Sequence, residues 1–342
     1  MSKRKINLSL KGKITKPVGI AIFTTVMLLM ALIIILYHNP LADPVQEMIK
    51  KIIACVIIVI AIIVFSVLYD KITVLPVELY QSRHLIWKLA KNDFRKRYSG
   101  SYLGGIWAMA QPGVTVVMYY MVFDIVFNSP GPLLNDGTRA PYVLSLTAGL
   151  VPWFFFSEAL NHGTMALLEY NYLVKKVVFK ISILPIIKVI AAGFIHVFFV
   201  GGLLVVACFY GYFPTIYTIQ IFYYSACLFV FVLALCYTTC AVVVFFRDLS
   251  QIINIVLQIG MWATPILWNL GDMQSRYGDV VLLFKLNPIV YIVDGYRSAI
   301  MEKQWFFEDF FSTMYFWIIT ALLFGIGALV FKRLKVHFAD VL

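Results

Sequence analysis

Residues 186–210 read IIKVIAAGFIHVFFVGGLLVVACFY, and Lys188 is the only charged side chain among them. A helix of about 20 predominantly apolar residues is long enough to cross the hydrocarbon core of a lipid bilayer. This stretch therefore predicts a membrane-spanning helix.

Runs of the same kind recur along the chain of 342 residues. Hydrophobic residues make up 62% of the sequence and charged residues 13%, whereas an ordinary soluble domain has about 25% charged residues. This composition excludes a soluble globular protein and predicts an all-α integral membrane protein with about eight spans. The eight predicted spans are residues 18–37, 52–69, 103–128, 142–168, 186–210, 219–246, 251–270 and 312–331. Gly and Pro inside the fourth and seventh runs predict internal breaks there.

The cationic residues indicate the orientation. The chain has 28 Lys and Arg against 17 Asp and Glu, a net charge of +11. Twenty of the cationic residues lie in segments on the side of the N-terminus, and seven lie on the other side. Because cytoplasmic loops retain Lys and Arg, we predict a multi-pass protein of the cytoplasmic (inner) membrane with both termini in the cytoplasm. Such charges meet lipid headgroups, and no nucleic-acid partner is expected.

The segment SRHLIWKLAKNDFRKRY at 82–98 is too charged to cross a membrane but has the pattern of an amphipathic helix. One side is broadly apolar, and the other carries His84, Lys88, Lys91 and Arg95. This pattern is typical of a helix that lies in the cytoplasmic interface. Asp93 and Arg97 project into the apolar arc one turn apart, where an unpaired charge is costly. Either they pair with each other, or Arg97 faces an anionic ligand.

Two segments between spans carry more apolar residues than simple loops need. The inside segment 169–185 mixes lysines with large apolar side chains, so it is either a plain topogenic loop or a docking surface for another protein. In the outside region 271–311, the pieces 280–286 and 288–293 are too short to span and suit re-entrant half-helices. Asp294 and Arg297 follow them, where an interfacial salt bridge is expected.

The sequence lacks the motifs of several enzyme classes. It has no GxxxxGK[ST] phosphate-binding loop, no HExxH and no GxSxG, so the chain is not expected to hydrolyse ATP or to be an enzyme by itself. No cysteine has a spacing typical of a metal site. Asp124, Glu158 and Lys188 are the only charges inside the predicted spans, each near a boundary, which disfavours an ion-coupled transporter.

Aromatic residues make up 16% of the chain. Most are expected to belong to the interfacial belts or to the core. An aromatic-lined conduit would also suit a sugar chain, because the apolar faces of pyranose rings pack on flat aromatic surfaces.

Several motifs in fixed order resemble one transporter family. They are LIWKLAKNDFRKRYSGSYLGGIWAMAQP, YYMVFDIVFNS, the stretch from Pro141 to Pro185, VVVFFRDLSQIINIVLQIGMWATPILW, LNPIVYIVDGYRSAI and the closing HFADVL. Together they are similar to the permease subunit of polysaccharide, teichoic acid and O-antigen ABC exporters, over about residues 82–342. The stretches TPILW and NPIVYIVDGYRSAI and the chain end are most similar to the wall teichoic acid branch.

The resemblance implies a homodimer above two separate ATPase subunits, which export an undecaprenyl-type diphosphate-linked glycan. ATP and magnesium would belong to the ATPases, and no cofactor to this chain. Residues 82–102 would form an interfacial gate helix, and 103–342 a six-span core. That core would hold a coupling segment at 169–185 and extracellular re-entrant helices in 271–311. Residues 1–81, a basic tail and two further spans, are additional to the family core.

The resemblance also implies roles for particular residues. Those expected to bind the diphosphate headgroup are Arg83, Lys88, Lys91, Arg95 and Arg97. Those expected to line the conduit are Trp107, Tyr119, Tyr120, Phe123, Trp262, Trp268, Tyr291 and Tyr296. Those expected to dock the ATPase are Tyr172, Leu173, Lys175, Lys176 and Phe179. The alternatives are an ABC exporter of another lipid or drug, or an integral membrane glycosyl- or acyltransferase.

Overall fold

Helices dominate the computed structural model, which describes residues 16–36, 44–97, 102, 104–134, 137–175, 180–271, 273 and 278–342. The predicted all-α fold is confirmed, because the one β contact among these residues is an isolated bridge between Leu133 and Arg139. The chain divides into two compact units, residues 1–81 and 82–342.

The first unit is a helical hairpin with a short third helix. Its elements are α1 (Lys16–Leu36), α2 (Pro44–Ile72) and α3 (Val74–Gln81). The rings of Phe23 on α1 and Phe65 on α2 stack with centroids 3.9 Å apart. Gly19 lies so close to the ring of Tyr69 that a Cβ atom there would overlap it. The two long helices therefore pack closely, while most of their other apolar side chains remain exposed and suit a lipid surface.

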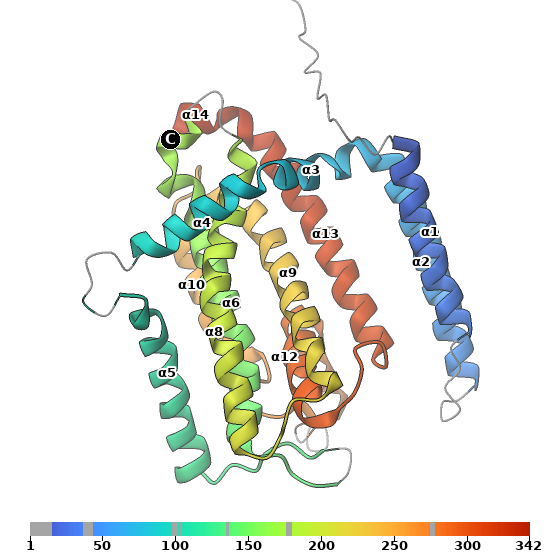
Figure 1. Ribbon diagram of the computed structural model, residues 1–342, viewed down its shortest axis with the longest axis vertical. Helices are drawn as coiled ribbons and strands as arrows, with labels where there is room; N and C mark the ends of the chain where they lie inside the picture. Colours follow the sequence, from blue (N-terminus) through green and yellow to red (C-terminus); the bar gives the residue numbers. More distant parts are fainter. Residues whose placement is uncertain are drawn as a thin grey trace, which may run out of the picture. The chain divides into compact units, whose positions relative to one another are not determined.

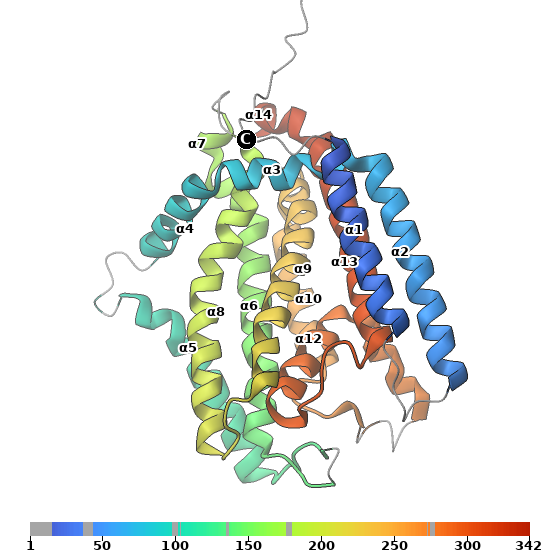
Figure 2. The ribbon, with the colours of Figure 1, turned by 45° about the vertical axis from the view of Figure 1, so that its right-hand side comes forward.

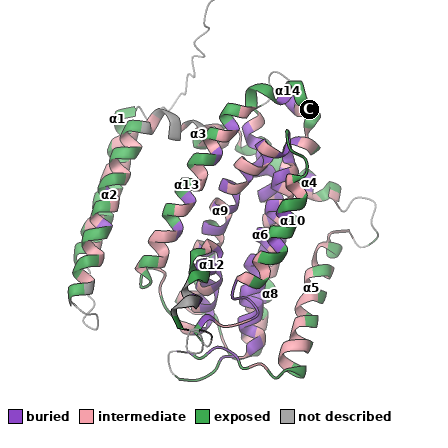
Figure 3. Cartoon of the chain, turned by 180° about the vertical axis from the view of Figure 1, so that it is seen from behind, coloured by how far each residue is buried: buried purple, intermediate pink, exposed green. Residues whose placement is uncertain are grey.

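Four long helices form the core of the second unit (Figures 1 and 2). They are α6 (Tyr142–Glu169), α8 (Leu184–Phe209), α9 (Gln220–Val243) and α13 (Phe310–Leu334). α6 packs against α8 and α9, and α13 packs against α9. Burial follows this arrangement, since α6 and α9 carry many more buried residues than α13 (Figure 3).

Small residues let the core helices approach one another. A Cβ atom on Gly163 of α6 would overlap the Sγ atom of Cys236 on α9, and one on Gly327 of α13 would lie 2.8 Å from the backbone oxygen of Ala234. Close backbone approach at Gly is a common way for membrane helices to gain packing contacts.

α5 (Trp107–Tyr119) lies at the side of the core and packs only loosely against α6 (Figures 1 and 3). It continues into η2 (Tyr120–Val126), a π-helical segment, and neither element contains a buried residue.

The remaining elements lie near the two ends of the core. α4 (Arg83–Arg97), α7 (Asn171–Val174) and α14 (Phe338–Val341) lie at one end, and α12 (Pro288–Arg297) lies toward the other (Figure 2). α10 (Leu249–Ala263) is a shorter helix that follows α9 in the sequence and packs against α6 and α9. The 3-10 helices are η1 (Gly104–Ile106), η3 (Ile181–Ile183), η4 (Ile216–Ile219), η5 (Gly278–Leu286) and η7 (Lys335–His337), and η6 (Ser298–Glu302) is a π-helix.

Seven of the predicted spans correspond to helices of sufficient length. Within the described residues, seven segments are long and apolar enough to cross a membrane, so the chain is a multi-pass membrane protein. The remaining prediction, the seventh span at 251–270, is not one long helix. α10 ends at Ala263, and Thr264 has extended backbone angles. At about 1.5 Å per residue its 15 residues rise about 22 Å, less than the hydrocarbon thickness of about 30 Å.

The prediction that the fourth span is broken is wrong. α6 runs without interruption through Gly149 and Pro152. Neighbouring helices often compensate for the missing hydrogen bond of a proline in a membrane helix, and Pro152 is buried among them. Gly149 has a packing role instead, because a Cβ atom there would lie 3.1 Å from a methyl carbon of Ile266.

The two short apolar pieces of the outside region form helices. They are η5, a 3-10 helix, and α12, separated by Asn287. The Asn287 side chain accepts a hydrogen bond from the backbone N–H of Ile289 at 3.1 Å and so caps α12. Its amide also donates to the Thr264 hydroxyl at 2.9 Å, which ties this cap to the end of α10. That η5 and α12 enter the membrane as re-entrant helices stays a prediction.

Candidate functional site

One face of α4 packs on the core. Ile86, Ala90 and Asp93 are buried, and their spacing of four and three residues places them on the same side of the helix. The ring of Trp87 contacts Phe194 of α8 edge-on, with centroids 5.2 Å apart. Apolar contacts therefore hold α4 against α8, in addition to the ion pair between Asp93 and Lys188 that is described below.

The other face of α4 carries most of the predicted headgroup ligands. Arg83, Lys88, Lys91 and Arg95 are exposed. Arg97 is different, because its side chain is only 14% exposed. The structure thus separates an exposed basic surface of α4 from one largely enclosed guanidinium.

Arg97 lies between two carboxylates. Its Nη2 atom is 3.3 Å from Asp93, and its Nη1 atom donates to Glu158 of α6 at 2.8 Å. Of the two alternatives for Asp93 and Arg97, the structure shows the one in which they pair with each other. The partner Glu158 was not predicted. It lies near the middle of α6 rather than near a boundary, about 16 Å from the end of that helix at 1.5 Å per residue.

Asp93 also binds the ammonium group of Lys188. The Lys188 Nζ atom donates to Asp93 at 2.6 Å and to Glu169 at 2.5 Å, and the Tyr170 hydroxyl donates to Asp93 at 2.7 Å. The Lys188 side chain is 3% exposed. We call Asp93, Arg97, Glu158, Glu169, Tyr170 and Lys188 the charge network; it joins α4, α6 and α8.

Asp93 has a lowered pKa in this network. Burial alone would raise the pKa of the carboxyl, but hydrogen bonds from Lys188 and Tyr170 and the positive charges of Lys188 and Arg97 outweigh it. Burial and the bond to the Asp93 carboxylate raise the pKa of the Tyr170 hydroxyl. Asp93 is therefore charged and Tyr170 protonated at neutral pH, as an ion pair with a neutral donor requires.

Arg297 organises the other end of the core. Its guanidinium donates to the backbone oxygens of Pro265 at 2.7 Å, Ile266 at 3.0 Å and Ser145 at 3.3 Å. The expected salt bridge to Asp294 is present but longer, at 3.6 Å. Arg297 thus satisfies carbonyl groups that the turn after α10 would leave without partners.

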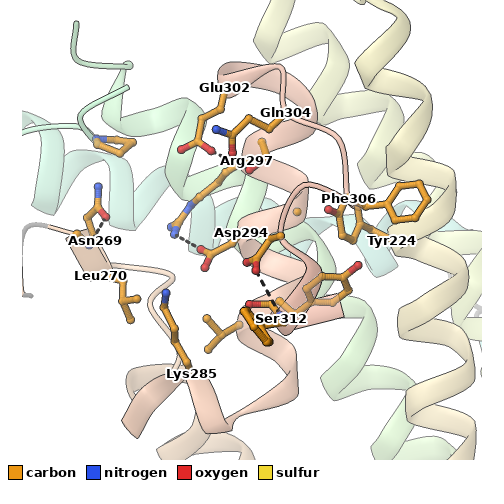
Figure 4. A pocket seen from close by; sticks show the side chains of 18 of the residues that line it. Tyr224, Asn269, Leu270, Lys285, Asp294, Arg297, Glu302, Gln304, Phe306 and Ser312 are labelled. Carbon is orange, nitrogen blue, oxygen red and sulfur yellow. Dashed lines mark hydrogen bonds and ion pairs between the residues drawn. The ribbon is translucent and has the colours of Figure 1, made fainter. Parts of the chain in front are cut away.

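A polar cavity of about 560 Å³ lies beside Arg297 (Figure 4). Asp294, Glu302 and Lys285 line it. The Glu302 carboxylate accepts a hydrogen bond from Ser298 at 2.8 Å. Charges of both signs therefore line this cavity, with Lys285 and Arg297 beside Asp294, Glu302 and Asp309.

The predicted conduit aromatics occupy different environments. Trp107 and Trp262 are exposed, and Tyr119, Tyr120, Phe123 and Trp268 are partly exposed. Tyr291 is buried and its hydroxyl lies 3.2 Å from that of Tyr223. Tyr296 is fully buried, and its hydroxyl contacts Ser225 at 2.6 Å and His196 at 3.0 Å. Tyr296 is therefore enclosed by helices in this chain, and the conduit roles of the eight aromatic residues stay predictions.

The predicted docking residues gather around α7. Tyr172 and Lys175 are exposed and Leu173 is partly exposed, whereas Val174 is buried. Lys176 and Phe179 lie outside the described residues. Glu169 and Tyr170, which precede α7, belong to the charge network, so the start of this segment is fixed to α4 and α8.

Residues 84–301 match the family model described as ABC-2 type transporter. The chain is also similar to the O-antigen export system permease protein RfbA of Myxococcus xanthus. The two are 28% identical over 263 residues, which cover 77% of this chain and 97% of the relative. A protein of the same name from Klebsiella pneumoniae is 24% identical over 261 residues, covering 75% of this chain and 95% of the relative.

Proposed function

Because the chain belongs to the ABC-2 type transporter family, we propose that it is the membrane permease of an ABC exporter that moves a polysaccharide across the cytoplasmic membrane. The observation that supports this proposal is the family match over residues 84–301, which extends from α4 to η6. The relatives named as O-antigen export permeases support a polysaccharide of the O-antigen, capsule or teichoic acid kind as the cargo.

In this proposal two copies of the chain assemble with two separate ATPase subunits, which bind ATP and magnesium. The permease hydrolyses no ATP by itself. The ATPases dock at residues 169–185, where the exposed Tyr172 and Lys175 support a protein interface. Movement of this segment reaches α4 through Tyr170 and Asp93, which are joined by a hydrogen bond.

The exposed basic surface of α4 binds the diphosphate of an undecaprenyl-type carrier in the cytoplasmic leaflet. Charge-assisted contacts from Lys and Arg suit phosphate oxygens. Arg83, Lys88, Lys91 and Arg95 provide these charges on an interfacial helix. Arg97 is engaged with Glu158 and Asp93, so it orients α4 in addition to any contact with the headgroup.

Reconstitution of the permease with its ATPases in vesicles tests this function. The measured quantity is ATP-dependent transport of a fluorescent undecaprenyl diphosphate-linked glycan. We expect the triple variant Lys88→Ala, Lys91→Ala, Arg95→Ala to lose at least about tenfold in transport, since each basic residue near an anionic surface contributes about 1 kcal/mol.

A second triple variant supplies the matched control. Lys332→Ala, Arg333→Ala, Lys335→Ala removes three charges from the end of α13 and η7, and we expect nearly full transport. Equal losses in both variants would contradict the headgroup role of α4. A wild-type complex without ATP-dependent transport of any such glycan would overturn the permease proposal itself.

A further inference from the structure

A second polar cavity, of about 460 Å³, lies between α5, α6 and α8. Its polar lining residues are Gln111 and Thr115 of α5, Ser157, Glu158, Asn161 and His162 of α6, and His196 of α8. All three helices belong to segments with the length and composition of membrane spans. The cavity is therefore a polar space at the depth of the bilayer.

Several of these side chains have hydrogen-bonding capacity that the protein does not use. The hydroxyls of Thr115 and Ser157 donate to backbone oxygens of their own helices. The carboxamides of Gln111 and Asn161 and the imidazole of His162 have no hydrogen-bond partner among the residues that the structure describes. Polar side chains in spanning helices are costly unless they face a partner or a cavity, so this lining suits a polar occupant.

The charge of the cavity indicates what kind of occupant fits. Glu158 is its one carboxylate among the described residues, and Arg97 neutralises it at 2.8 Å. The remaining groups are neutral donors and acceptors, as two carboxamides provide. Trp107, Phe154 and Phe199 add aromatic surface to the walls. Neutral amides beside aromatic rings suit a neutral polyhydroxyl ring, whose hydroxyls bond to the amides and whose apolar face packs on the rings.

The position of the cavity connects it to α4. Arg97, at the end of α4, is bonded to the cavity residue Glu158. The exposed cations of α4 precede Arg97 along the same helix, from Arg83 to Arg95. A lipid diphosphate on this surface would hold the group attached to its second phosphate near the cavity.

We propose that the cavity between α5, α6 and α8 binds the sugar attached directly to the diphosphate of the lipid carrier. This assignment rests on the proposed function. The permease then recognises two adjacent parts of its cargo. The cationic side chains of α4 bind the diphosphate, and the carboxamides of Gln111 and Asn161 bind the sugar. The volume of about 460 Å³ lies within the usual range of small-ligand pockets.

Native mass spectrometry of the purified full-length protein tests the proposal. The probes are undecaprenyl diphosphate alone and the same lipid bearing one N-acetylglucosamine or one galactose. We expect the wild type to bind at least one sugar-bearing lipid about tenfold more tightly than the bare lipid, as two additional hydrogen bonds would give. Asn161→Leu and Gln111→Leu should each bring the ratio of the affinities for the sugar-bearing and the bare lipid close to one. The affinity for the bare lipid itself should not change.

Control variants and a control lipid show whether the preference arises in the cavity. Asn171→Leu makes the same chemical change at an exposed residue of α7 and should keep the full preference. The α4 triple variant should weaken the sugar-bearing and bare lipids equally, and its preference should remain. A monoglucosyl diacylglycerol should bind more weakly than the sugar-bearing diphosphate. If it binds as tightly, the assignment to the carrier-linked sugar is overturned.

Two further results would overturn the proposal. A wild-type protein that binds all the diphosphate lipids equally would refute a sugar site, and so would an Asn161→Leu variant that keeps the full preference. These results would leave the α4 headgroup role intact. Failure of the wild type to bind any diphosphate lipid would instead contradict the proposed function.

Discussion

At the scale of single residues, the charge network depends most on Lys188. Its ammonium group binds two carboxylates from different elements, Asp93 of α4 and Glu169 of α6. It is also 4.9 Å from the ring centroid of Tyr170, within the range of a cation–π contact. A side chain that is 3% exposed has little access to water as a replacement partner. Removing one member therefore takes a hydrogen-bonded partner from a buried charge, which costs more than the loss of an exposed ion pair.

A double-mutant cycle measures this dependence. We expect Lys188→Met and Asp93→Asn each to lower the free energy of unfolding by about 1–3 kcal/mol, since each takes one hydrogen-bonded partner from a buried charge that keeps its other partners. The double variant should lose less than the sum of the two, by about 1–3 kcal/mol. Unfolding in sodium dodecyl sulfate, followed by the loss of helical circular dichroism, provides the free energies.

The control for this cycle is Lys91→Met. Lys91 is exposed on the same helix as Asp93, so its replacement should change the free energy of unfolding by no more than about 0.5 kcal/mol. Additive losses from the Lys188 and Asp93 variants would contradict a direct interaction between these two residues.

At the scale of elements, the contact between α9 and α13 relies on the absence of a side chain at one position. Gly327 faces the backbone oxygen of Ala234, and a Cβ atom would approach it to 2.8 Å. A backbone atom inside a helix cannot rotate away as the end of a flexible side chain can. Gly325, two residues earlier on α13, has nothing within 4 Å of the corresponding position.

The two glycines form a matched pair for mutation. Gly327→Ala should separate α13 from α9 and lower the free energy of unfolding by about 1–3 kcal/mol, the usual cost of overpacking. Gly325→Ala should be neutral or raise it by up to about 1 kcal/mol, because alanine favours the helix. Thermal denaturation in detergent compares them. A Gly325→Ala variant as unstable as Gly327→Ala would refute the packing role of Gly327.

The elements also show what could be predicted from the sequence. Long apolar runs predicted seven helices near their observed bounds, because length and composition are local properties; α6, for example, covers 142–169 against a predicted 142–168. Pro152 misled the prediction, since burial among other helices decides whether a proline breaks a membrane helix. The pairing of Asp93 with Lys188 was not predicted because these residues are 95 positions apart. Helical periodicity relates only near neighbours.

At the scale of the whole molecule, the chain consists of two units with separate packing. Residues 82–342 contain the matched family region 84–301. The alignment with the relative from Myxococcus xanthus covers 97% of that relative and 77% of this chain. Because the relative is matched almost completely by part of this chain, we expect residues 82–342 to fold without the additional unit.

Deletion of residues 1–81 tests this independence. We expect residues 82–342 to accumulate in membranes and to melt within about 5 °C of the full chain, because the charge network and the four-helix core lie entirely in this part. Deletion of residues 262–342 is a control of equal length that removes α12 and α13, and it should prevent folding. Aggregation of the 82–342 chain would show that the first unit is needed for stability.

The spacing within the charge network also constrains how the protein is made. The ribosome adds Lys188 95 residues after Asp93, which is roughly 5–20 s later at about 5–20 residues per second. During this interval only Arg97 neutralises Asp93, and α8 is not yet in the membrane to receive the inner face of α4. We therefore expect α4, although it is synthesised before α6 and α8, to reach its final position on α8 only after both have been made.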